Sequence, residues 1–371
     1  MTATKGLEGV VATTSAISSI NHDVLTYRGY SIQDLAKYSS FEEVVYLLWK
    51  GELPDLDQLK SFKKKIAENA QVPDEIFEQI KTWPIHNVHP MAVLRTAVSA
   101  LGLFDPDADK RDLKANTEKA IRLQAKIGTI VAGFARIREG KEPVAPRSDL
   151  NLAANFLYML KNKVPTETEA RVFDTAMILH ADHELNASTF TARVCVATLS
   201  DIYSGVTAAI GALKGPLHGG ANEQVMNTLE KIGSPEKAED FIENALAKKQ
   251  KIMGFGHRVY KNGDPRARII KKMAEELTQN TDNEKWFDMS LHIEEIMKEK
   301  KGLLPNTDFY SATFYHSLGI ENDLFTPIFA VSRTSGWVAH ILEQYNDNRL
   351  IRPRAEYNGP AQRSYVPMSE R

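Results

Sequence analysis

Cysteine, excess charge and long hydrophobic runs are all scarce in this 371-residue sequence. Its one cysteine, Cys195, lies in the apolar run 194–199, so no disulfide can form within the chain. A reducing compartment fits this composition, and we expect a cytoplasmic protein. A formal net charge of −2 argues against a nucleic acid as the main partner.

The hydrophobic segments predict neither a secretory signal nor a membrane span. Residues 1–19 contain Lys5 and Glu8 and lack a continuous apolar block. The most membrane-like stretch, residues 194–213, contains Asp201 and many small residues, which favours a buried helix. The overall composition, 43% hydrophobic and 25% charged, is typical of globular proteins.

Apolar residues recur with helical spacing along most of the chain, which predicts an all-α fold. Long helices are predicted near residues 117–139, 150–162, 167–180, 188–213 and 324–341. Minor short strands are predicted near the N-terminus, where residues 10–20 and 25–32 are rich in Val, Thr, Ser and Tyr.

The chain changes character after Gly215, which suggests a second lobe. Shorter, more charged helices are expected as far as Gly302, and core-like apolar spacing returns from Leu324. The length also exceeds the usual size of one domain. The tail beyond Arg352 is rich in Pro and Gly, so we expect no helix there.

Two histidines, His180 and His183, lie beside carboxylates in the segment HADHELNAS. A metal hydrolase is one interpretation, but the HExxH spacing of zinc proteases is absent and no third ligand is evident. The other interpretation is structural: a helix end in which His180 is hydrogen-bonded in the core.

Two further histidines lie among glycines, in GPLHGGAN (His218) and MGFGHRVYKNGDPR (His257). The first segment lacks the Gly-Lys-Ser/Thr ending of a P-loop, and the second lacks the third glycine of a dinucleotide-binding motif. In the second, Asp264 and Pro265 are typical of a helix N-cap and first residue. Arg266 would then lie in the first turn, which makes sense if an anion binds there, the alternative being a solvated basic loop.

Asp308 and Arg333 each allow a structural and a functional interpretation. Asp308 begins a predicted helix that continues through Tyr315, so it could be a cap or a reacting group. Arg333 lies in an apolar helix, where a buried guanidinium needs an anionic partner.

Together, the segments HADHELNAS, GPLHGGAN, MGFGHRVYKNGDPR, NTDFYS, SRTSGW and IRPRAEY closely resemble the citrate synthase family, in family order along nearly the whole chain. The resemblance implies a two-lobed helical fold, with a large lobe of residues 1–218 and 322–371 and a mobile small lobe of residues 219–321. It also implies a homodimer in which Arg352 serves the neighbouring subunit's site.

The resemblance implies that acetyl-CoA condenses with oxaloacetate and that citryl-CoA is hydrolysed, without a metal or a tightly bound cofactor. A 2-methylcitrate synthase that uses propionyl-CoA is the nearest alternative, and a noncatalytic helical scaffold is an alternative of another class. The implied site consists of His218, His257 and Asp308 as catalytic residues, of His183, His257, Arg266, Arg333 and Arg352 for oxaloacetate, and of Lys261, Arg258, Gly254 and Gly256 for CoA.

In this scheme Asp308 takes a proton from the acetyl methyl group, His218 hydrogen-bonds the thioester oxygen and His257 polarises the keto group. An aspartate at a helix N-terminus is ordinarily a feeble base. We therefore expect closure of the small lobe to desolvate Asp308 and raise its pKa.

Overall fold

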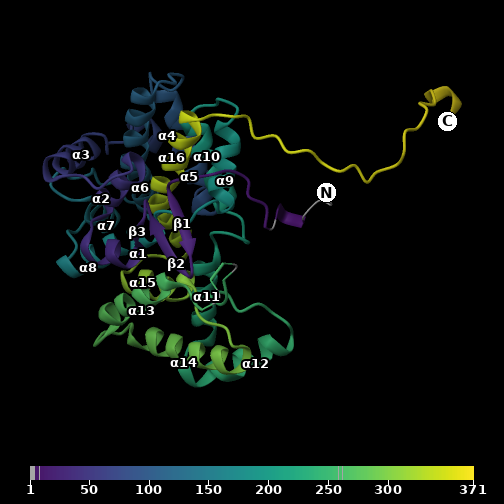
Figure 1. Cartoon of the computed structure of the whole chain (residues 1–371). Helices are drawn as coiled ribbons and strands as arrows, with labels where there is room; N and C mark the ends of the chain where they lie inside the picture. The colour runs from purple at the N-terminus through teal and green to yellow at the C-terminus, as the bar shows by residue number, and fades with distance from the viewer. Residues whose placement is uncertain (1–4, 8, 258, 261) are drawn as a thin grey trace.

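The computed structural model describes residues 5–7, 9–257, 259–260 and 262–371. Within these ranges the chain forms sixteen α-helices and one small antiparallel sheet with strand order β1-β2-β3. Figure 1 shows a larger upper lobe, and a smaller lower lobe that contains α11 to α15. The predicted all-α, two-lobed fold is confirmed.

The strands are β1 (Ser18–Asn21), β2 (Val24–Tyr27) and β3 (Tyr30–Ser31). The helices are α1 (Ile32–Tyr38), α2 (Phe41–Lys50), α3 (Leu56–Glu68), α4 (Asp74–Thr82), α5 (Pro90–Leu101), α6 (Leu113–Arg138), α7 (Leu152–Lys161), α8 (Glu167–His180), α9 (Ala187–Val196), α10 (Ile202–Leu213), α11 (Ala221–Ile232), α12 (Ala238–Ala247), α13 (Pro265–Thr278), α14 (Glu284–Lys301), α15 (Thr307–Ser317) and α16 (Phe325–Asn346).

Local sequence signals explain where two functionally important helices begin. Asp264 caps α13 by accepting a hydrogen bond from the Arg266 backbone N–H, and Pro265 is the first helical residue, as predicted. Asn306 caps α15 in the same way and places Asp308 in the first turn. Both helices therefore present their N-terminal turns, with their free amide groups, at defined positions.

The predicted continuous helix over 188–213 is wrong, because the structure has two helices there. α9 ends at Val196, and α10 begins after Asp201, whose side chain accepts a hydrogen bond from the Ser204 backbone N–H. Leu199 between them has a φ of 66°, which no helix allows. Both helices pack on α16, so the apolar pattern continues across the break and conceals it.

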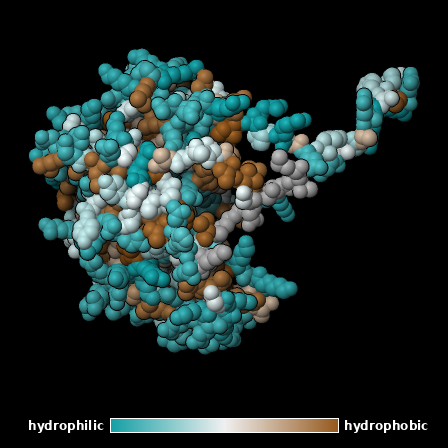
Figure 2. Space-filling view, in the orientation of Figure 1, coloured by the Kyte–Doolittle hydropathy of each residue, from teal (hydrophilic) through white to brown (hydrophobic). Residues whose placement is uncertain are grey.

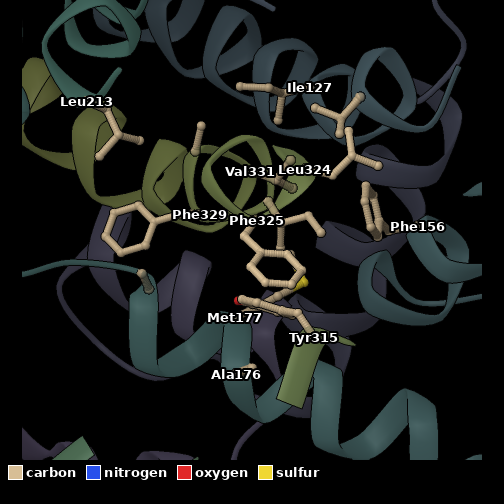
Figure 3. Close-up of a cluster of buried hydrophobic side chains, with 14 of the residues drawn as sticks. Ile127, Phe156, Ala176, Met177, Leu213, Tyr315, Leu324, Phe325, Phe329 and Val331 are labelled. Atoms are coloured by element: carbon tan, nitrogen blue, oxygen red, sulfur yellow. The ribbon is translucent and has the colours of Figure 1, made fainter. Parts of the chain in front are cut away.

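α16 forms the centre of the upper lobe. It packs against α2, α5, α6, α8, α9 and α10, and almost all of its side chains are buried. Figure 3 shows the cluster around it, which includes Ile127, Phe156, Met177, Leu213, Tyr315, Phe325, Phe329 and Val331. Each fully buried side chain of this size contributes about 1.5–3 kcal/mol, so α16 is a rigid support for whatever it carries.

The C-terminal tail leaves the body of the molecule. Asn348 is still attached to the upper lobe, where its Nδ2 donates to the Ala197 carbonyl at 3.2 Å, and the tail beyond Ile351 runs away from both lobes (Figure 1). Residues 347–371 are exposed apart from Ile351. On the same face, Figure 2 shows a mostly hydrophilic lower lobe and hydrophobic side chains gathered at mid-height. Among the described residues, every helix is too short or too polar to span a lipid bilayer.

Candidate active site

A cavity of about 820 Å³ collects the side chains of segments that are far apart in the sequence. Its lining includes residues near the N-terminus, residues 183–187 and 190–191, and residues 306–308, together with Gly6, Val10, His257, Val259, Asp264 and Arg266. The predicted site residues that line it are His183, His218, His257, Arg266, Asp308 and Arg333. The structure therefore brings the three expected catalytic side chains together.

His218 is held in one neutral tautomer. Its Nε2 lies 3.3 Å from the Ser188 backbone nitrogen and 2.8 Å from Ser188 Oγ. Because a backbone N–H can only donate, Nε2 is unprotonated and Nδ1 carries the proton. Burial, and then the nearby Arg333 charge, lower the His218 pKa to about 4, so the ring is neutral at pH 7. Trp337 Nε1 fixes Ser188 by donating to its Oγ at 3.0 Å.

His257 is held in the opposite tautomer. Its Nδ1 accepts hydrogen bonds from the backbone N–H groups of Val259 at 3.0 Å and Tyr260 at 3.3 Å. Nε2 therefore carries the proton. Burial and the Arg266 charge lower the His257 pKa, which favours the neutral ring. The ring lies 5.3 Å from that of His183, whose Nε2 is 3.0 Å from the Tyr260 hydroxyl.

Arg266 is paired with Asp264, a partner that the sequence interpretation missed. The Asp264 carboxylate accepts from Arg266 Nε at 3.0 Å and from a terminal guanidinium nitrogen at 2.7 Å. It also accepts from the Thr307 hydroxyl at 2.5 Å. Burial opposes its ionisation, but Arg266 holds the Asp264 pKa well below its usual range. The Asp-Pro-Arg spacing predicts the cap, but it does not show that the same carboxylate also neutralises the Arg266 cation.

Arg333, by contrast, has no carboxylate within ion-pair distance among the described residues. Its Nε donates to the His180 carbonyl at 2.7 Å, and its guanidinium lies 4.7 Å from the ring centroid of Phe329. Burial lowers the Arg333 pKa to about 10, which leaves it charged at pH 7. A buried, unpaired cation on a cavity wall indicates an anionic ligand.

Asp308 lies half-buried on the same cavity. Burial raises its pKa to about 6, in spite of the nearby positive charges of Arg266 and Arg333. Desolvation, together with the charge of Asp264, therefore outweighs the effect of the two guanidinium groups on the Asp308 pKa. A carboxylate with this pKa is ionised at pH 7 and is a stronger base than an exposed aspartate.

Gly254 and Gly256 join the His257 loop to the beginning of α15. Gly254 O accepts from the Asn306 backbone N–H at 2.8 Å, and Gly256 O accepts from Asn306 Nδ2 at 2.9 Å. Both glycines have positive φ, and a Cβ at Gly254 would lie 2.9 Å from the Phe309 side chain. Neither glycine lines the cavity, and their contact with CoA stays a prediction. The other two predicted CoA contacts, Arg258 and Lys261, lie outside the described residues.

Two predicted residues lie elsewhere. Arg352 is exposed in the tail and does not line the cavity of its own chain. His180 is fully buried; its Nδ1 donates to the Ala176 carbonyl at 2.8 Å, and burial lowers its pKa to about 3. This geometry favours the structural interpretation of His180. In the described part of the chain, no three His, Cys, Asp or Glu side chains are grouped to hold a metal ion.

Comparison with known proteins matches a family model described as "Citrate synthase, C-terminal domain" to residues 6–354. The chain is 62% identical to "Citrate synthase 2" of Bacillus subtilis over the full length of both, and 45% identical to "2-methylcitrate synthase 1" of Corynebacterium glutamicum over 99% of this chain and 98% of that protein. A Thermoplasma acidophilum citrate synthase, solved with carboxymethyl coenzyme A and oxaloacetate, superposes with a TM-score of 0.93 at 36% identity, over 99% of each chain. Sequence and fold thus agree along the whole chain, which belongs to the citrate synthase family.

Proposed function

We propose that this chain condenses acetyl-CoA with oxaloacetate and hydrolyses the resulting thioester to citrate and CoA. The observation that carries the proposal is the set of groups on one cavity: a carboxylate with a pKa of about 6 and two neutral imidazoles of defined tautomer. The citrate synthases to which the chain is similar, one of them solved with oxaloacetate and a CoA derivative, support the choice of substrates.

The first step is removal of a proton from the acetyl methyl group. Asp308 accepts this proton, and the electron pair of the broken C–H bond moves into the enolate. The Nδ1–H of His218 donates a hydrogen bond to the thioester oxygen, where the negative charge develops. His218 is neutral, so its Nδ1 proton stays on the ring, and the side chain stabilises the thioester oxygen by donating a hydrogen bond.

The second step joins the enolate carbon to the keto carbon of oxaloacetate. The Nε2–H of His257 donates a hydrogen bond to the keto oxygen, which polarises the carbonyl and stabilises the negative charge as the alkoxide forms. Arg266, Arg333 and His183 hold the two carboxylates, and guanidinium groups suit this task because they bind carboxylates in a bidentate manner. Hydrolysis of the thioester then releases CoA.

The charges on the cavity support a site shared between two subunits. Arg266 is paired with Asp264, Arg333 faces a cavity that also contains the carboxylates of Asp308 and Glu184, and oxaloacetate adds two negative charges. A further cation is therefore needed, and Arg352 from the tail of a second copy supplies it. The tail runs away from its own body, where a neighbouring copy can receive it (Figure 1).

Subunit mixing tests this arrangement. Hybrids of Arg352→Ala and His218→Ala subunits contain one site with both changes and one intact site, provided that Arg352 acts across the interface. A random mixture then regains about a quarter of the parental activity, since about half of the dimers are hybrids. If Arg352 acts within its own chain, every site carries one lesion and mixing restores nothing.

We also propose that residues 219–321 form a small lobe that moves against residues 1–218 and 322–371, and that the loop around Gly254, Gly256, Arg258 and Lys261 contacts CoA. Cytoplasmic location remains our expectation from the single cysteine.

Release of free thiol from acetyl-CoA, with and without oxaloacetate, tests the reaction. We expect thiol release to require both substrates and to fall at least a hundredfold in His218→Ala. A noncatalytic scaffold would release no thiol at all. The similarity to 2-methylcitrate synthase 1 keeps propionyl-CoA as the second candidate substrate. One methylene is worth about 1–3 kcal/mol in a pocket, so the ratio of kcat/KM for the two acyl-CoA substrates decides between them.

A further inference from the structure

The residues that precede His183 are held directly against α16. Arg333 Nε donates to the His180 carbonyl at 2.7 Å, and the Gly336 backbone N–H donates to the Ala181 carbonyl at 3.1 Å. A Cβ at Gly336 would lie 2.4 Å from that carbonyl oxygen. A side chain there would therefore push residues 180–182, the bend that leads from α8 to His183, away from the helix. The bend that presents His183 to the cavity is thus in contact with the backbone of α16.

The next residue in this bend, Asp182, is a fully buried carboxylate that the proposed reaction does not use. It accepts a hydrogen bond from the Ser18 hydroxyl, and His340 Nε2 lies 3.4 Å from its carboxylate. Its backbone N–H donates to the Tyr27 hydroxyl at 3.1 Å. Side chain and backbone of Asp182 are therefore both anchored, immediately before His183.

The orientation of the His340 ring is set from its other side. Its Nδ1 lies 3.2 Å from a guanidinium nitrogen of Arg193, and both residues are buried. A guanidinium can only donate, so Nδ1 is unprotonated and Nε2 carries the proton that faces Asp182. Arg193 is itself held by Glu343 at 2.5 Å and by Gln344 Oε1 at 3.0 Å. The His340 ring consequently has one donor direction, toward the bend.

Arg333, Gly336 and His340 are spaced i, i+3 and i+7, which places them on one face of α16. That face supplies a guanidinium to the cavity and holds the bend that carries His183. His340 does not line the cavity, so any effect it has on the ligand passes through Asp182.

We propose that His340 and Asp182 are positioning residues for the keto dicarboxylate: they fix His183 relative to Arg333 through the His340–Asp182 hydrogen bond. This inference rests on the proposed function, because His183 and Arg333 are taken there to bind the substrate carboxylates. Misplacing one of two converging contacts weakens binding of the ligand that needs both, and leaves binding of the acyl-CoA unaffected.

Two substitutions at His340 separate its two hydrogen bonds. His340→Gln keeps an N–H donor near the position of Nε2, toward Asp182, whereas His340→Asn keeps only an acceptor near Nδ1, toward Arg193. We expect His340→Asn to raise the KM for oxaloacetate about tenfold, with the KM for acetyl-CoA changed less than about twofold. The KM of His340→Gln for oxaloacetate should stay within about threefold of the parental value. Thr334→Val removes a buried hydroxyl of α16 that donates to the Ala330 carbonyl within the same helix, and serves as the control with unchanged KM values.

A purely stabilising role for His340 would lower the thermal midpoint in both variants and leave the KM for oxaloacetate unchanged, which would overturn the proposal. Equal KM increases in the two variants would overturn it as well. If His340→Asn does not fold, Ser18→Ala is the deciding variant, because it removes the hydroxyl that donates to the Asp182 carboxylate. An increase of about threefold in the KM for oxaloacetate supports the proposal, and an unchanged KM refutes it.

Calorimetric titration with oxaloacetate alone distinguishes this inference from the proposed function. Binding by the parent protein without thiol release from any acyl-CoA would contradict the proposed reaction but not the positioning role. Normal turnover by the parent, together with unchanged oxaloacetate binding by His340→Asn, would contradict only the positioning role.

Discussion

Replacing Asp308 by Asn should strongly reduce kcat and make the protein more stable at neutral pH. Burial raises the Asp308 pKa from 3.8 to about 6, and each pH unit of pKa difference corresponds to about 1.4 kcal/mol. Ionised Asp308 therefore costs the folded state about 3 kcal/mol of stability relative to the unfolded chain. Asparagine has nearly the same shape and does not ionise, so it avoids this cost.

The pH dependence follows from the sign of that pKa difference. Below about pH 4 the carboxyl is protonated in both the folded and the unfolded state, and its ionisation costs nothing. As the pH rises from about 4 to about 6, the unfolded chain ionises first and the folded state loses stability relative to it; above pH 6 the loss is constant. The stability advantage of Asp308→Asn should therefore grow between pH 4 and pH 7.

Urea unfolding of the parent and the variant at several pH values measures this difference in the free energy of unfolding. Unfolding is followed by both far-ultraviolet circular dichroism and tryptophan fluorescence, and coincident transitions show that both lobes unfold together. Asp282→Asn, at an exposed position of the same lobe, is the control for the removal of a carboxylate charge. Parental kcat should rise with pH through about 6, and Asp308→Asn should lose about 10²- to 10⁴-fold in kcat. A stability difference that does not vary with pH would show that burial does not raise the Asp308 pKa.

Three further predictions concern other positions. Arg333→Met should raise the KM for oxaloacetate about a hundredfold or more. Thermal stability should be kept or increased, because the guanidinium has no carboxylate partner among the described residues, and the cost of burying its charge outweighs the lost hydrogen bond to the His180 carbonyl; a large loss of stability would contradict this. Gly254→Ala should cost about 1–3 kcal/mol and lower kcat, because its φ is 85° and its surroundings are filled, whereas Gly140→Ala, with a φ of 74° in open space, should cost less in the same unfolding assay. Burial and the neighbouring Glu42 raise the Asp174 pKa to about 8, so ionisation costs stability increasingly between about pH 4 and 8. Asp174→Asn should then be stabilised more at pH 8 than at pH 5 in urea unfolding, and an equal gain at both would refute this.

Features encoded within a few residues could be predicted from the sequence. The cap at Asp264, the first-turn position of Asp308 and the burial of Arg333 all follow from local spacing, and the structure has each of them. The resemblance of six segments to one family supplied the grouping of distant residues. Spacing alone offered several interpretations for each segment and did not choose among them.

Features that depend on contacts between distant segments could not be predicted in this way. The hydrogen bond between Ser188 and Trp337 joins residues 149 positions apart, and no local pattern marks either of them as a support for His218. The contact of His340 with Asp182 spans 158 positions. The end of α9 was concealed for a related reason: apolar periodicity records which side chains are buried, and both helices are buried on the same neighbour.

The contacts around Asp264 and Asn306 divide the reacting groups between two rigid units. Asp264 binds Arg266 and Thr307, and Asn306 binds the glycines beside His257, so the polarising imidazole and the base Asp308 belong to one unit. His218 is fixed through Ser188 and Trp337 to α16, which also carries Arg333. The lobe movement proposed above would therefore change the distance from Asp308 to His218, the two groups proposed to act on the acetyl group, while Asp308 and His257 would keep their spacing. Under that proposal, proton removal from the acetyl group is the step that lobe closure would control most directly, which would protect the thioester from reacting before the keto acid is bound.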